Sequence, residues 1–252
     1  MPADTYGETL RRLAMPDVPN LPGLTAHEFT DPIEIFEFKV FKQPLAPSLL
    51  EAMMHFLVRA VDEYQLAHEA LKQAAVIYNQ LGNAERVALE RKEQIPSLLL
   101  GAMDTADSNV VHLFDRGRDH LELCVNLLRR AIFFGRRYAK SGGRPELPRK
   151  VERLGVFSDA VASRIIEVRN ALEHADERFV NGEVDTIWVR VESEAISYAA
   201  ERLYYTEIIE WFREFDSLIS FIFQPFAEIH KEEDEEYEAF MKELDDESDD
   251  KH

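Results

Sequence analysis

Apolar residues recur at alternating intervals of four and three in four segments of this chain, and this spacing most constrains its fold. It lines one face of an α-helix with apolar side chains. The four segments run from about residue 48 to 82, 108 to 140, 148 to 180 and 200 to 223. Four such helices joined by short connections predict an antiparallel helical bundle, so we expect a mainly α fold.

Turn residues set the expected breaks between these helices. Gly82-Asn83, the stretch 141–145 and Asn181-Gly182 contain residues that commonly end helices. A shorter helix is expected from about 84 to 94, before Pro96. Between 185 and 198, apolar and polar residues alternate, which predicts a small accessory β-hairpin.

The two ends of the chain differ in composition from its middle. Residues 1–47 contain seven prolines, and we expect an extended arm with a short strand at 33–41. Residues 48–230 are expected to form the helical bundle. Residues 231–252 form an acidic tail, and from Glu228 onward thirteen acidic residues face three lysines, a net charge of −10.

The charge of the chain is strongly negative but unevenly distributed. A formal net charge of −19 argues against a protein that coats nucleic acid through bulk electrostatics. From Arg116 to Arg153, however, eleven basic residues outnumber four acidic ones, a net charge of +7. A basic middle beside an acidic tail is therefore more informative than the total.

Several classes of protein are disfavoured by what the sequence lacks. No apolar run is long enough to span a bilayer, and the first residues do not resemble a signal peptide. The single Cys124 excludes an intrachain disulfide, so we expect a reduced, cytoplasmic protein. Nucleotide-binding glycine motifs, H-E-x-x-H and the paired Glu-x-x-His of di-iron bundles are all missing, so we expect no cofactor and no metal.

Polar residues interrupt the apolar stripes of the first two long helices. Glu63 interrupts the first stripe, and His120 and Cys124 lie on the second. A histidine in this position is more often a hydrogen-bonded core residue than a catalyst. Cys124 is expected to be a small core residue.

The third helix carries the most function-like pattern, R-N-x-x-x-H, formed by Arg169, Asn170 and His174. Arginine holds phosphate through a fork of N–H groups. Histidine suits proton transfer near neutral pH. Five residues along a helix give about 140° of net rotation and about 7.5 Å of rise, so one Arg169 and its own His174 do not point at one spot.

This pattern resembles the R-x4-6-H motif of the HEPN superfamily, whose members are helical bundles and include many metal-independent RNases of toxin–antitoxin and antiviral systems. The polar residue after the arginine also matches, and the resemblance covers about residues 104–226. It implies a homodimer in which two motif helices meet and form a composite endoribonuclease site. There His174 would transfer a proton at the ribose 2′-hydroxyl, Arg169 would bind the scissile phosphate, and Asn170 would orient one of them. The basic stretch 129–153 would then contact the RNA backbone.

Two other interpretations stay open at this stage. Arg169 and Glu173 are spaced to form a surface ion pair, and a histidine near a helix C-terminus interacts favourably with the helix dipole. The HEPN superfamily also contains members that are not catalytic. If this chain resembles them, it is a helical binding or assembly module that partners another protein, such as an antitoxin or a nucleotidyltransferase-like subunit.

Overall fold

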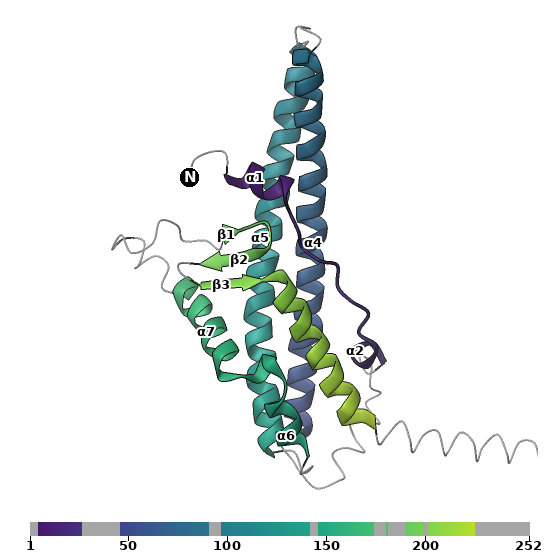
Figure 1. The fold of residues 1–252 in the computed structure, drawn as a ribbon, viewed down its shortest axis with the longest axis vertical. Helices are drawn as coiled ribbons and strands as arrows, with labels where there is room; N and C mark the ends of the chain where they lie inside the picture. Colours follow the sequence, from purple (N-terminus) through teal and green to yellow (C-terminus); the bar gives the residue numbers. More distant parts are fainter. Residues whose placement is uncertain are drawn as a thin grey trace, which may run out of the picture.

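The computed structural model describes residues 5–26, 46–90, 97–141, 146–173, 180, 190–198 and 201–224. These residues form a mainly helical protein with a small three-stranded antiparallel sheet, as Figure 1 shows. The expected fold class is confirmed. None of the described helices is long and apolar enough to cross a membrane.

Two long helices, α4 (Ala46–Glu90) and α5 (Ser97–Ser141), pack side by side along the length of the molecule (Figure 1). Gly117 permits their close approach, because a Cβ atom there would lie 2.6 Å from Leu71 Cγ and 3.3 Å from the Ala67 carbonyl oxygen. Many of the stripe positions expected to face the core are buried on both helices, among them Met53, Ala60, Ala67, Leu71, Cys124, Leu127, Ala131 and Tyr138.

The expected start of the first helix and end of the second agree with the structure, but the end of α4 and the start of α5 were predicted wrongly. Helix α4 continues through Gly82-Asn83 to Glu90, and α5 begins at Ser97 rather than near residue 108. A glycine inside a helix costs only about 1 kcal/mol relative to alanine. The extensive packing of α4 on α5 outweighs a cost of this size, so local stop signals do not decide where the pair ends.

The expected motif helix of residues 148–180 is also not continuous. It is divided into α6 (Leu147–Glu152), a 3-10 turn η1 (Gly155–Phe157) and α7 (Asp159–Glu173). At the break, the Glu214 carboxylate accepts hydrogen bonds from the backbone N–H groups of Gly155 and Val156, at 2.9 and 2.6 Å. A side chain from another helix thus satisfies donors that a continuous helix would have used internally.

The sheet has the order β1 (Arg190–Val191), β2 (Ala195–Tyr198) and β3 (Glu201–Tyr204), with each neighbouring pair antiparallel. The expected hairpin is therefore present but gains a third strand. That strand occupies the residues where the last helix was expected to begin, and residues 205–224 form that helix instead. Glu207 caps the N-terminus of this helix, since its Oε2 accepts a hydrogen bond from the Tyr204 N–H at 3.1 Å, as in a capping box.

The described part of the N-terminal arm contains two short helices, α1 (Thr5–Arg11) and α2 (Pro22–Ala26), joined by a segment without regular structure. It crosses the bundle, with Met15 and Leu21 buried in the main core. Tyr64 donates a hydrogen bond to the Pro16 carbonyl, and Asp216 Oδ1 accepts the Leu24 N–H. The strand expected at 33–41 and the acidic tail of 231–252 lie outside the described residues.

Candidate functional site

The residues of the R-N-x-x-x-H pattern belong to the end of α7. The backbones of Arg169 and Asn170 lie in the last turns of this helix, which the structure describes to Glu173. Their side chains, and all of His174, lie outside the described residues. The helical setting expected for Arg169 and Asn170 is therefore confirmed, while the relation of either residue to His174 stays a prediction.

Two apolar side chains anchor α7 in the core. Ile165 and Val168 are each only 1% exposed, whereas Ile166 is 43% exposed. Position 170 follows the exposed Ile166 by four residues, and position 169 follows the buried Ile165 by four.

Polar contacts fix α7 to the helix of residues 205–224. The Arg164 guanidinium donates to Glu207 Oε1 at 2.8 Å and lies 5.9 Å from the centre of the Trp211 ring. Glu207 also holds the N-terminus of that helix through Tyr204. One carboxylate thus joins the motif helix to the strand–helix junction beside it.

The first residues of α7 are held by Arg136 from α5. Its guanidinium donates a hydrogen bond to the Phe157 carbonyl and forms an ion pair with Asp159 at 3.0 Å. Figure 1 shows α7 running beside α5 from this point towards the sheet, and the two helices are in contact. Arg136 belongs to the basic stretch but has a structural role at the start of the motif helix.

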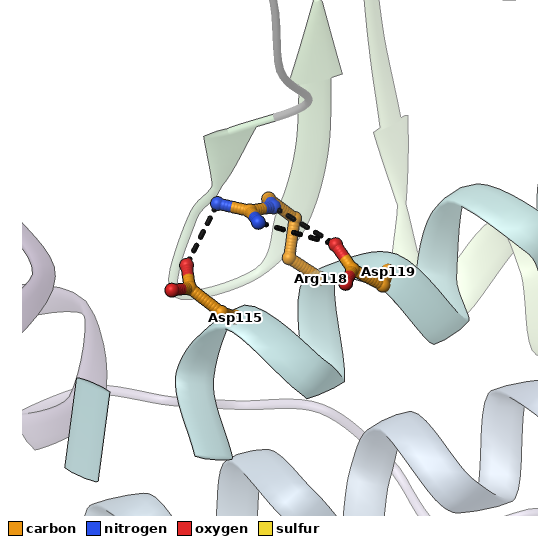
Figure 2. A network of polar contacts seen from close by, with 3 residues as sticks. All are labelled: Asp115, Arg118 and Asp119. Atoms are coloured by element: carbon orange, nitrogen blue, oxygen red, sulfur yellow. Dashed lines mark hydrogen bonds and ion pairs between the residues drawn. The ribbon is translucent and has the colours of Figure 1, made fainter. Parts of the chain in front are cut away.

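Not every cation of the wider basic region from Arg116 to Arg153 has a free charge. Arg118 lies between Asp115 and Asp119, as Figure 2 shows, with Nη1 at 2.8 Å from one carboxylate and Nη2 at 3.1 Å from the other. Its side chain is 17% exposed. Two adjacent carboxylates compensate its charge, so Arg118 is a poor candidate for binding phosphate.

A carboxylate–imidazole pair links α4 to α5. His120 Nδ1 lies 2.6 Å from Glu63 Oε2, and the two side chains are 21% and 12% exposed. Arg116 Nε donates to His120 Nε2 at 3.4 Å. The expected hydrogen bonding of His120 is confirmed, but its side chain is part-buried and does not lie in the core. Its partner was not anticipated, although both residues interrupt apolar stripes of helices that pack on each other.

Cys124 and Tyr64 lie in the same region of the core and are poorly suited to chemistry. Cys124 is fully buried. Burial, and to a lesser extent the nearby Glu63 carboxylate, raises the pKa of its thiol. Burial likewise raises the pKa of the Tyr64 hydroxyl. A thiol with a raised pKa is rarely present as the thiolate, which is the reactive form, so Cys124 is poorly reactive. Its complete burial confirms the expected core position.

Within the described ranges, no group of three or more His, Cys, Asp or Glu side chains is arranged to hold a metal ion. Comparison with known proteins finds no matching family model, no matching curated protein and no matching solved structure.

Proposed function

We propose that this chain is a metal-independent endoribonuclease of the HEPN type, acting in a toxin–antitoxin or antiviral system. The observation that carries the proposal is the setting of α7. Its core-facing side is fixed by Ile165 and Val168, and it presents the positions of Arg169 and Asn170 in the turns that follow. A rigid helix is a suitable support for residues that must hold a phosphate in a defined orientation.

The neighbouring helix also supports RNA as the substrate. Helix α7 packs on α5, whose second half carries five cationic residues and no acidic residue from Leu123 to Ser141. Cations there attract a phosphate backbone locally, even though the whole chain is acidic.

In the proposed reaction, the ribose 2′-oxygen attacks the adjacent phosphorus and the 5′-oxygen of the next nucleotide leaves. His174 accepts the 2′-hydroxyl proton while water protonates the leaving 5′-oxygen, or His174 protonates the leaving 5′-oxygen while water takes up the 2′-hydroxyl proton. Arg169 binds the phosphate and stabilises the charge that develops on it. The products are a 2′,3′-cyclic phosphate and a free 5′-hydroxyl. Five residues along one helix would give about 140° of net rotation, so the proposal combines residues from two protomers in each site.

The test is cleavage of single-stranded RNA by the purified chain in EDTA. His174→Ala should lower the rate about 10²- to 10⁴-fold, and Arg169→Ala should cost as much or more. DNA of the same sequence should survive, because it lacks the 2′-hydroxyl. His112→Ala and Arg213→Ala change exposed residues of the same types and should leave the rate unchanged.

Wild-type protein that binds RNA without cutting it, or cleavage that persists in both motif variants, contradicts the nuclease proposal. The chain is then a non-catalytic helical module, and its function lies in binding a partner.

A further inference from the structure

A row of aromatic rings crosses from α4 to α5, with part-buried rings in its middle and exposed rings at its two ends. It consists of His55 and Phe56 on α4 and Phe134 and Phe133 on α5, which we call the aromatic row. Successive ring centres are 5.5, 5.6 and 5.3 Å apart. The Phe133 side is open, since this residue is 47% exposed, and His55 is exposed at the other end.

Two arginines lie over this row. The Arg130 guanidinium is 5.3 Å from the centre of the Phe56 ring, and that of Arg137 is 4.5 Å from the centre of Phe133. Both arginines are exposed, and neither forms an ion pair with a carboxylate of the described residues. The sequence from Leu123 to Pro145 contains six cations and no acid. The charge over the row is therefore not compensated locally, in contrast to that of Arg118.

We propose that the aromatic row, with Arg130 and Arg137, binds single-stranded RNA by stacking bases on the Phe133 and Arg137 planes while guanidinium N–H groups contact phosphates. Exposed rings alternating with cations are the combination that single-strand binders use. The proposal deepens the ribonuclease function and rests on it, because it assigns the surface that holds the substrate.

The chemistry of the row favours a single strand over other anionic partners. A duplex keeps its base faces stacked inside, so it can offer phosphates to the arginines but no base to Phe133. An acidic peptide likewise engages the cations alone. Dependence on the ring, separate from dependence on charge, is therefore the signature of the proposed ligand.

These two contributions are separable by measurement. Phe133→Ala should weaken binding about 5- to 160-fold while leaving its salt dependence unchanged. Phe133→Trp should retain the affinity. The double variant Arg130→Gln with Arg137→Gln should reduce the slope of log affinity against log salt by about 1.4, that is, about 0.7 for each lost phosphate contact.

The experiment is a fluorescence anisotropy titration of a labelled twelve-nucleotide single-stranded RNA in EDTA. The full chain carries His174→Ala in every sample, which should slow cleavage well below the time of the titration, and DNA of the same sequence and an RNA duplex serve as further probes. Leu123→Ala, on the same helix and 40% exposed, is the control for Phe133→Ala. Arg213→Gln, exposed on the 205–224 helix, is the control for the arginines. Thermal melts and light scattering accompany each variant.

The affinities for single-stranded RNA and single-stranded DNA should both depend on Phe133, whereas the affinity for the duplex should not. A Phe133→Ala affinity equal to that of the Leu123→Ala control overturns the inference. The inference also fails if a variant of the aromatic row separates the protomers in light scattering and leaves RNA affinity unchanged. The row would then be an interface between two copies of the chain. Phe133-dependent binding without any cleavage by the wild type supports the inference and refutes the nuclease. If the wild type cuts RNA but binding does not depend on Phe133, the nuclease is supported and the inference about the aromatic row is refuted.

Discussion

Removing the Glu214 carboxylate should destabilise the protein at the break that precedes the motif helix. Glu214 accepts the N–H groups of Gly155 and Val156 at 2.9 and 2.6 Å. Val156 is completely buried, so its N–H would lose its partner without access to water, whereas Gly155 is exposed and can be rehydrated. A hydrogen bond to a charged group contributes about 1.5–3 kcal/mol net. Glu214→Ala should therefore lower the free energy of unfolding by about 2–3 kcal/mol.

Urea denaturation monitored by circular dichroism measures this change, and amide hydrogen exchange localises it. Glu214→Gln keeps one carbonyl acceptor and should lose about half as much as Glu214→Ala. The control is Glu210→Ala on the same helix. Glu210 pairs with Arg213 at 3.2 Å with both side chains more than half exposed, and such pairs contribute about 0–1 kcal/mol.

In the alanine variant, exchange should accelerate first at the amides of Gly155 and Val156. A Glu214→Ala protein within about 0.5 kcal/mol of the Glu210→Ala control would refute the reasoning, since this clamp would then contribute no more than a surface pair. RNA cleavage should fall in Glu214→Ala, although Glu214 touches no substrate, because α7 would lose its fixed starting point.

Three further predictions concern assembly, the tail and pH. We expect a homodimer with α7 in the interface, where Ile166 is 43% exposed; Ile166→Asp should dissociate it in light scattering, and a monomeric wild type at micromolar concentration would contradict it. Deleting residues 231–252 should tighten RNA binding, most at low salt where screening is weak, and unchanged affinity there would exclude this role. Burial lowers the pKa of His68 from its usual 6.5, against the opposing effect of Asp17. The unfolded chain therefore takes up a proton at His68 more readily than the folded protein, and stability is lost as the pH falls through about 6.5. His68→Asn should lose less urea resistance than the wild type between pH 7.5 and 5.5. A variant that loses as much urea resistance as the wild type would contradict this role of His68.

The apolar stripes determined the helices and their buried faces. Residues such as Met53, Cys124 and Phe215 are spaced to fall on one side of a helix, and each is buried. This periodicity is local, so it is visible without knowledge of what covers the stripe. The same spacing predicted that Arg169 and Asn170 lie on a helix, as they do.

The helix boundaries were decided by packing. Local signals at Gly82-Asn83 predict a stop, but α4 and α5 continue beside each other past these points. The energy of a stop signal is about 1 kcal/mol, and packing over many residues exceeds it. Tyr204 shows the same effect, since it matches the stripe of the last helix yet ends β3 and is 40% exposed.

The polar contacts that position the candidate site were decided by the tertiary structure alone. Glu214 interrupts the expected motif helix from 58 residues away, and Glu63 meets His120 across 57 residues. A carboxylate in a sequence carries no sign of which distant donor it will bind, because that partner is chosen when the apolar faces dock. The sequence therefore determined that these segments are helical and which side they bury, and only the docked helices determined where each helix begins and ends and what holds α7.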